Sequence, residues 1–308
     1  MTRKALLIGL NEYSGGINGL RGCVNDVMQV KDLLETYYGF NDPDIQMLVN
    51  SQATRAGILA GIDWLTAGSQ AGDVLIFHYS GHGSQVADNG HDELDGSDEI
   101  IIPYDHDWDN PLRDDDLKAA FERCDPGASL TVVMDCCHSG TINRPAPAAD
   151  ADLSTLPLSR YLDPPDAVQA KIDQLQKERA AAIESRLPEA PASIASALTA
   201  MRDQLLEALS RLLGRRRNNR FQVVKTTENN VLLAACRDDQ TSADAFIAND
   251  YHGAFTWGLA EAVQATGGHL TYRQLAERVG VSGQAYAQQP QLECQPASFD
   301  RQVFSPSV

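Results

Sequence analysis

Two segments of the chain end a short apolar run in residues that could act as a nucleophile and a base. Residues 130–140 read LTVVMDCCHSG and contain Cys137, and residues 74–83 read VLIFHYSGHG and contain His82. Apolar runs of this length are typical of buried strands. In an open parallel sheet, ligands bind beyond the carboxyl ends of the strands, so neighbouring strands of this kind would bring Cys137 and His82 to one crevice.

The alternation of side chains along a strand predicts which neighbours join this pair. Asp135 should share a side with Cys137, and Ser80 should share a side with His82. His138 follows Cys137 directly and should point to the opposite face. His82 arrives from another segment and is therefore the better partner for Cys137.

These residue types fit acyl transfer. A thiolate is the attacking form of cysteine, and a nearby imidazole lowers the pKa of the thiol. Backbone N–H groups at Cys137 and at Gly83 could bind a developing oxyanion, and the small residues there let a carbonyl group approach. The pattern favours a Cys–His hydrolase over the alternative, a buried structural cysteine and a histidine with ordinary core contacts.

The composition excludes several classes of protein. A chain of 308 residues can bury one large core with an insert, and the net charge of −17 argues against nucleic acid or anionic membranes as partners. No apolar run approaches the roughly 20 residues that a membrane span needs. The N-terminal residues 1–10 fit a first strand better than a signal peptide, and the six cysteines form no disulfide framework. We therefore expect a cytoplasmic protein with reduced thiols.

Strand-like and helix-like stretches alternate around these segments. This alternation predicts a mostly parallel, doubly wound sheet. The expected strands are residues 5–10, 45–49, 74–83, 130–134 and 231–235, with a short terminal strand after residue 289. The expected helices are residues 24–37, 54–67, 253–265 and 271–279.

The stretch from Asp88 to Asp116 is rich in Asp and Glu, with Arg113 as its one Lys or Arg. Such a run is most often a solvated loop. The strand-like residues 99–103 should anchor the acidic loops on both sides to the sheet, and clustered carboxylates could then hold calcium, which takes six to eight oxygen ligands. The stretch is not an EF-hand, because Ser97 stands where that loop needs glycine.

An insert separates the two globular parts. Residues 144–165 are rich in Pro, Ala and Asp, which suggests an exposed, weakly structured connection. Residues 166–187 and 194–213 have helical spacing and are separated by prolines, so they predict a helical hairpin, which a basic stretch at 215–220 closes. The chain thus divides into residues 1–143, 144–220 and 221–308.

The two chemical segments contain the motifs YSGHG, Tyr79–Gly83, and DCCHSG, Asp135–Gly140. Further motifs lie at Leu20–Asp26, Asp98–Pro103, Asp114–Asp116 and Asp238–Asp244. In this order they resemble the metacaspases, which are caspase-like cysteine peptidases of plants, protists, fungi and bacteria. The bacterial members are called orthocaspases. The resemblance covers residues 1–143 as a large subunit and 221–308 as a small subunit. It implies a caspase-hemoglobinase-like α/β fold with a mostly parallel central sheet flanked by helices and an inserted helical hairpin.

The resemblance also assigns roles to individual residues. It implies that His82 is the general base and Cys137 the nucleophile of a cysteine endopeptidase. It implies that four residues line the pocket for the residue before the scissile bond: Cys23, Asp26, Ser80 and Asp135. Carboxylates at the bottom of a pocket select a cation, so the expected protein substrates are cut after Arg or Lys.

Calcium activation is implied through Asp98, Asp114 and Asp115. Calcium-dependent relatives carry a fourth acidic ligand where this chain has Arg144, and a cation at that position opposes calcium. The region 144–220 lies where this family is commonly cut during activation. We expect cleavage near the arginine cluster, by the protein itself or by an upstream protease. The candidate positions are Arg215, Arg216, Arg217 and Arg220.

Two other interpretations stay open at this point. The chain could be a catalytically silent caspase-like scaffold that binds partners through the helical hairpin, although it keeps both His82 and Cys137. It could also be a paracaspase-like Arg peptidase that needs no metal. The acidic run Asp114–Asp116 and the wording of the cysteine motif favour a metacaspase.

Overall fold

The protein is described from a computed structural model that covers residues 1–90, 96–138, 155–184, 229–237, 240–283, 286 and 288–306, except for the side chains of 183–184 and 280–283. The chain divides into two compact units. The first comprises residues 1–84, 99–163 and 223–308, and the second comprises residues 85–98 and 164–222. None of the described helices combines the length and the apolar character that a membrane crossing requires.

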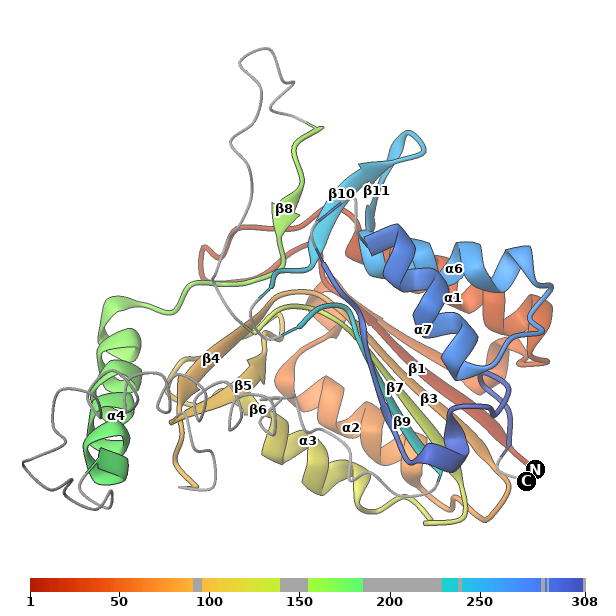
Figure 1. Ribbon diagram of the computed structural model, residues 1–308, viewed down its shortest axis with the longest axis horizontal. Coiled ribbons are helices and arrows are strands. Elements are labelled where there is room, and N and C mark those ends of the chain that lie inside the picture. Colours follow the sequence, from red (N-terminus) through yellow and green to blue (C-terminus); the bar gives the residue numbers. More distant parts are fainter. Residues whose placement is uncertain are drawn as a thin grey trace, which may run out of the picture. The chain divides into compact units, whose positions relative to one another are not determined.

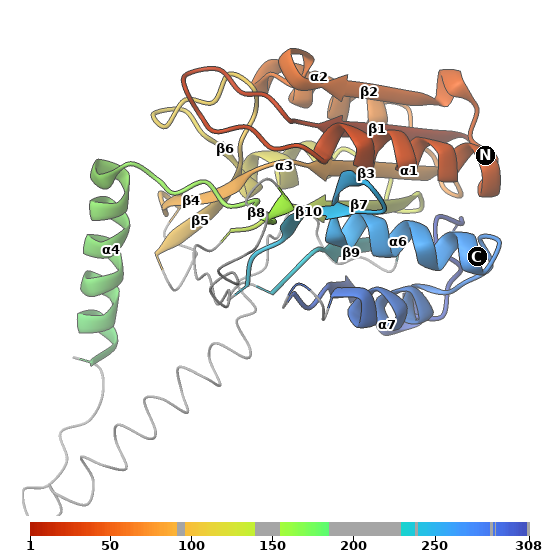
Figure 2. The same cartoon turned by 90° about the horizontal axis from the view of Figure 1, so that it is seen from above.

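A six-stranded sheet with the order β12-β9-β7-β3-β1-β2 forms the centre of the first unit. The strands run parallel except for β12, which pairs antiparallel with β9 (Figure 2). Their bounds are β1 Arg3–Gly9, β2 Ile45–Val49, β3 Val74–Ser80, β7 Ser129–Asp135, β9 Asn230–Ala234 and β12 Gln291–Cys294. The prediction of a mostly parallel sheet flanked by helices is confirmed.

Helices cover both faces of this sheet: α1, α6 and α7 lie on one face, and α2 and α3 lie on the other (Figure 1). Their bounds are α1 Cys23–Tyr37, α2 Arg55–Thr66, α3 Asp114–Phe121, α6 Ala254–Ala265 and α7 Tyr272–Gly283. Burial on both faces explains why the central strands are apolar throughout. In β1, Leu7 joins the core with α1 and α6, whereas Leu6 packs against Gly61 of α2.

Two small sheets complete the described strands. One has the order β11-β10-β8, with bounds β8 Leu158–Ser159, β10 Ala243–Ile247 and β11 Asp250–Gly253. The other has the order β4-β5-β6, with bounds β4 Gly83–Ala87, β5 Ser97–Ile101 and β6 Leu112–Arg113. The expectation that residues 99–103 belong to the central sheet is wrong, because this segment pairs with neighbours close in sequence instead.

The described part of the second unit contains the helix α4, Asp166–Glu184, and the strand residues on either side of the 91–95 gap. Among the described side chains of α4, Ile172 is buried, and Arg179 forms an ion pair with the buried Asp88. The first helix of the expected hairpin is therefore present. The second, expected at residues 194–213, lies outside the described residues.

Candidate active site

The strands β3 and β7 end side by side, as their apolar runs predict. Their last residues, Ser80 and Asp135, are paired in register, and both side chains are fully buried. His82 and Cys137 follow directly, beyond the strand ends. Gly83 packs against the carbonyl oxygen of Cys137, a contact that leaves no room for a Cβ atom. The two segments thus meet at the carboxyl edge of the sheet.

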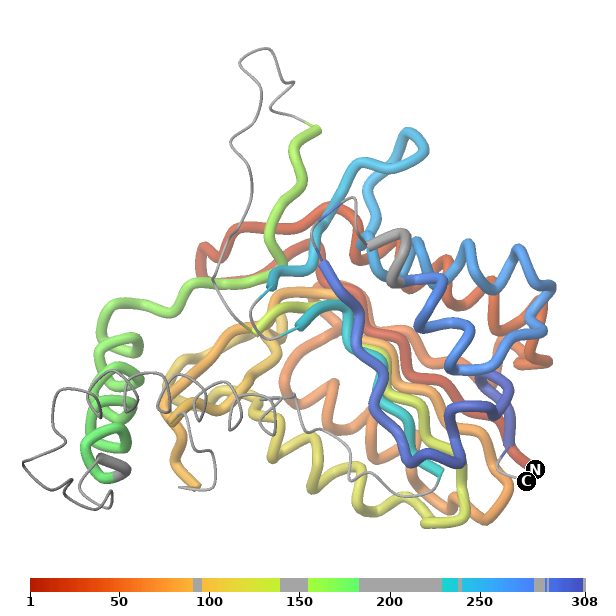
Figure 3. Tube along the Cα trace, viewed as in Figure 1, coloured from red at the N-terminus to blue at the C-terminus, as the bar shows by residue number. Residues whose placement is uncertain are grey.

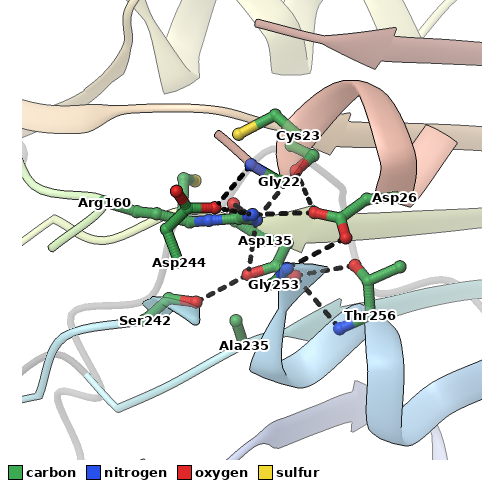
Figure 4. Close-up of polar contacts among 12 residues, drawn as sticks. Gly22, Cys23, Asp26, Asp135, Arg160, Ala235, Ser242, Asp244, Gly253 and Thr256 are labelled. Atoms are coloured by element: carbon green, nitrogen blue, oxygen red, sulfur yellow. Dashed lines mark hydrogen bonds and ion pairs between the residues drawn. The ribbon is translucent and has the colours of Figure 1, made fainter. Parts of the chain in front are cut away.

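Three aspartates from separate parts of the chain form a buried acidic pocket at this edge. Asp26 comes from the first turn of α1, Asp135 from the end of β7 and Asp244 from β10. All three are 0% exposed. Figure 4 shows the three aspartates. We call these three residues together with Ser80 the acidic pocket.

Backbone N–H groups orient each carboxylate of the pocket. The N–H of Gly253 donates to Asp26 at 2.9 Å, and that of Thr256 donates to Asp135 at 3.0 Å. The N–H groups of Arg21 and Gly22 donate to Asp244 at 2.8 and 2.9 Å. These donors lie at or near the N-termini of α1 and α6, where unpaired N–H groups favour negative charge.

Side-chain hydroxyls complete the environment of two of the carboxylates. The hydroxyl of Ser80 donates to Asp26 at 2.7 Å. Asp135 accepts from the hydroxyls of Ser242 at 2.6 Å and Thr256 at 2.7 Å. The carboxylates are therefore fixed in position, and their oxygens are presented to a shared centre.

The guanidinium group of Arg160 occupies that centre. Its Nη2 lies 2.7 Å from Asp26 and 3.0 Å from Asp244. Its Nη1 lies 3.1 Å from the carboxylate of Asp135, 3.2 Å from the carbonyl oxygen of the same residue and 2.7 Å from Ser80. Arg160 is 0% exposed, although it belongs to the stretch 144–165 that the composition predicts to be an exposed connection. That prediction is wrong for Arg160.

The charges of the pocket are strongly coupled. Burial alone would raise the pKa of Asp26, but the guanidinium of Arg160, the nearby His252 and the hydroxyl of Ser80 lower it to about 2. Burial alone would lower the pKa of Arg160, but the surrounding carboxylates raise it well above the ordinary value. Burial and the neighbouring Asp26 raise the pKa of Asp135, although Arg160 opposes this shift. Negative charge in the pocket is therefore costly unless a cation lies among the carboxyl groups.

Two glycines leave space for the guanidinium and for the carboxylates around it. A Cβ atom at Gly253 would lie 2.5 Å from Nη1 of Arg160 and would also overlap the carboxylate of Asp135. A Cβ atom at Gly22 would lie 2.6 Å from Oδ1 of Asp244. Any larger residue at these positions would push into the pocket.

The backbone of Arg160 lies at the nucleophile. Its carbonyl oxygen accepts hydrogen bonds from the N–H of Gly83 at 2.9 Å and from the N–H of Cys137 at 3.4 Å. The N–H of Arg160 donates to the carbonyl oxygen of Ser242 at 3.1 Å. The thiol of Cys137 also contacts the backbone of Ser242. The two amides predicted to form an oxyanion hole therefore bind one carbonyl group.

His82 is held with one ring nitrogen available. Its Nε2 lies 2.9 Å from the carbonyl oxygen of Asn18, which can only accept, so Nε2 carries the proton and Nδ1 is the basic atom. Among the described residues, Nδ1 has no hydrogen-bond partner. The hydroxyl of Tyr13 accepts from the N–H of His82 at 2.8 Å, and the two rings lie 5.1 Å apart. Burial lowers the pKa of His82, which keeps the ring neutral.

The remaining predicted residues take the following places. His138 lies against Cys136, with Nε2 3.4 Å from that sulfur atom, in agreement with the expectation that it does not pair with Cys137. Cys23 is the first residue of α1 and is fully buried. Burial, together with Asp244 and Asp26, raises its pKa, so it is an inert part of the pocket wall.

The predicted calcium ligands do not form a cluster in the described part of the chain. Asp98 and Asp114 are buried, whereas the side chain of Asp115 is 47% exposed and lies 3.8 Å from Lys118. Among the described residues, no group of three or more His, Cys, Asp or Glu side chains could hold a metal ion. Arg144 and the candidate cleavage positions Arg215, Arg216, Arg217 and Arg220 lie outside the described residues.

Sequence reasoning missed Arg160, Asp244, Ser242, Gly253 and Thr256 as parts of this site. Asp244 falls in one of the motifs that carry the family resemblance, which could have indicated its role. A second signal was available for Arg160, because Arg144 and Arg160 are the only basic residues in the sequence from 144 to 165.

Comparisons with known proteins agree with the resemblance. A family profile described as "Metacaspase, peptidase C14 domain" matches residues 3–144. Metacaspase-1 of Pyricularia oryzae is 35% identical over 302 residues, which cover 95% of this chain and 71% of the relative. Metacaspase-1B of Aspergillus oryzae is 35% identical over 303 residues, with coverages of 95% and 67%.

A solved structure supports the fold alone. The protein GSU0716 from Geobacter sulfurreducens superimposes with a TM-score of 0.63 over 100% of both chains, at 22% sequence identity. At this sequence identity the likeness concerns the fold and carries no information on the reaction.

Proposed function

This chain belongs to the metacaspase family of cysteine-type endopeptidases, and we propose that it cleaves protein substrates after Arg or Lys with Cys137 as nucleophile and His82 as base. One observation carries the proposal. The chain's own Arg160 lies in the acidic pocket while its carbonyl oxygen lies between the N–H groups of Gly83 and Cys137. A substrate arginine bound in the same way would present its carbonyl carbon to the thiol.

The contacts of Arg160 favour Arg over Lys. The two terminal nitrogens of the guanidinium reach five acceptors on four residues: Asp26, Ser80, Asp135 and Asp244. A planar guanidinium can serve such a divided set, whereas the single ammonium of a lysine cannot reach all of it. We therefore expect Arg peptides to be the better substrates and Lys peptides the weaker ones.

The residues of the site divide the chemical work. His82 accepts the thiol proton at Nδ1, and the Cys137 sulfur attacks the carbonyl carbon of the substrate. The N–H groups of Gly83 and Cys137 stabilise the oxyanion that develops. His82 then donates the proton to the leaving amine, and water hydrolyses the thioester. The carbonyl of Asn18 keeps a proton on Nε2, so that Nδ1 is the atom that accepts and returns the catalytic proton.

Hydrolysis of a fluorogenic peptide library tests this function. Cleavage after Arg, weaker cleavage after Lys and loss of both in Cys137→Ala are expected. Absence of hydrolysis after any basic residue would instead support the silent scaffold. The ratio of the cleavage rates after Arg and after Lys also tests the pocket. Equal rates would show that the acceptors on the four pocket residues do not select a guanidinium.

Calcium activation through Asp98, Asp114 and Asp115 is a separate proposal, and no step above depends on it. Carboxylate oxygens are the donors that calcium prefers. A calcium titration of peptidase activity with a chelator control tests it, and unchanged activity in chelator would reject it. We also propose that the protein is made as a zymogen processed in the region 144–220, and that it acts in the cytoplasm, which the free thiols of its cysteines favour.

A further inference from the structure

The segment around Arg160 is bound on both sides like an extended peptide. On the N-terminal side, Leu158 and Ser159 pair antiparallel with β10 (Figure 3). On the C-terminal side, the N–H of Leu162 donates to the carbonyl of Gly83 at 2.9 Å. The hydroxyl of Ser84 donates to the carbonyl of Leu162 at 2.6 Å. Main-chain pairing of this kind is how sheet edges bind peptides.

The contacts place one peptide bond at the catalytic groups. The carbonyl of Arg160 lies at the N–H groups of Gly83 and Cys137, so the bond that follows it joins Arg160 to Tyr161. Tyr161 forms a bridge with Gly83, next to His82. This bond therefore has the position of a scissile bond, with its basic side chain in the pocket and its leaving side at the histidine.

We propose that Arg160–Tyr161 is the bond that this chain cuts in itself, and that Arg160 stays in the acidic pocket after the cut as a tethered product. This inference rests on the proposed function and gives the site its regulation. It moves the activation cleavage away from the arginine cluster 215–220. It also predicts that cleavage alone does not free the acidic pocket for a substrate, because Arg160 still occupies it.

The cut is an ordinary hydrolysis. The Cys137 sulfur bonds to the carbonyl carbon of Arg160 as the C–N bond to Tyr161 breaks, and His82 transfers the thiol proton to the nitrogen of Tyr161. Water then forms a C–O bond, the C–S bond breaks, and the thiol regains its proton. Tyr161 becomes a new N-terminus and Arg160 a new C-terminus.

Retention of the product follows from where the contacts lie. The ion pairs with the carboxylates and the pairing of Ser159 with β10 are all on the N-terminal side of the bond. The cut leaves them intact, and the fragment that ends at Arg160 also contains Cys137. A tether of this kind keeps its end at a millimolar effective concentration, so Arg160 competes with any free substrate.

Time courses of incubated protein test the first half of the proposal. N-terminal sequencing should find a fragment that begins at Tyr161 in the wild type but not in Cys137→Ala or Arg160→Ala. Arg160→Lys should still be cut, more slowly. If the wild type hydrolyses an Arg reporter peptide but no fragment begins at Tyr161, the cleavage site is wrong.

Reporter hydrolysis tests the second half. Fully cut wild-type enzyme should act on the Arg reporter at least about 10-fold more slowly than uncut Arg160→Ala, independently of enzyme concentration. Equal activity of the two would overturn the tethered product. If neither hydrolyses the reporter while both are folded by circular dichroism, the proposed function itself fails.

A second variant covers the case in which Arg160→Ala does not fold. Tyr161→Pro keeps Arg160 in the pocket and should stay uncut and inactive on the reporter. Full reporter activity of this uncut variant would show that the segment does not block the site, and would overturn the proposal.

Discussion

The same type of ion pair occurs in two very different places in this protein. Arg273 and Asp300 form a bidentate pair at 2.9 and 3.3 Å on the surface, where their side chains are 50% and 71% exposed. Arg160 forms pairs of similar length with Asp26, Asp135 and Asp244, and all four side chains are 0% exposed.

The difference between them lies in the surroundings and not in the pair geometry. Water solvates each member of the surface pair, so either partner can be lost at little cost. The pocket carboxylates cannot be solvated in the same way, and removing one charge from a buried set costs about 3–5 kcal/mol. A buried excess of carboxylate is therefore a binding site for a cation, whereas a surface pair is only a contact.

Removal of one pocket charge should have the largest effect. Asp244→Asn, in an Arg160→Ala background where the chain's own arginine does not compete, should lower kcat/KM for an Arg peptide by about 100-fold, equivalent to roughly 3 kcal/mol. The matched surface variant Asp300→Asn should leave kcat/KM unchanged. Similar losses in both variants would mean that burial is not what gives the pocket its specificity.

The pH dependence of stability should show the same contrast. The pKa of Asp26 is lowered from 3.8 to about 2, so its contribution to stability is complete above pH 4 and is lost as the pH falls through 2. By linkage this contribution is about 2 kcal/mol. Urea unfolding of Cys137→Ala, which stays uncut, should lose this amount between pH 4 and pH 2. When Asp26→Asn is added to Cys137→Ala, the free energy of unfolding should fall by less between pH 4 and pH 2.

The shape of the pocket should matter next. Gly253→Ala, again in the Arg160→Ala background, places a methyl group 2.5 Å from the position that Nη1 of Arg160 occupies and should lower hydrolysis of Arg peptides by about 10-fold. The hydrolysis rate of Lys peptides should fall by a smaller factor, because a lysine ammonium has no second nitrogen to place beside residue 253. Competition between matched Arg and Lys peptides measures the ratio. An unchanged ratio would show that Gly253 does not limit the guanidinium.

The smallest expected effect concerns the acid limb of the activity profile. Burial lowers the pKa of His82 below its ordinary value of 6.5, and the neutral ring is the active form. Activity of the Arg160→Ala variant should therefore persist below pH 6.5 and fall only at more acid pH. An acid limb above pH 6.5 would contradict a buried base. Asp300→Asn should show the same profile as its parent.

Local patterns account for the parts of the fold and site that were predicted correctly. The apolar runs that end at Ser80 and Asp135 are buried on both faces, and this single property marks them as central strands of a parallel sheet. Strand polarity then brings His82 and Cys137 to one edge. The strand-like residues 99–103 show the limit of such reasoning, since their apolar pattern did not reveal which sheet they join.

The sequence by itself determined the alternation of strands and helices, the edge of the sheet where the site lies, and the thiol and imidazole found there. These follow from the spacing of apolar residues and from strand direction, which are local properties. Only the tertiary structure decided that Arg160 lies in the pocket, with Asp244 beside it. A guanidinium is buried only where several carboxylates meet it, and here they come from segments far apart in the chain.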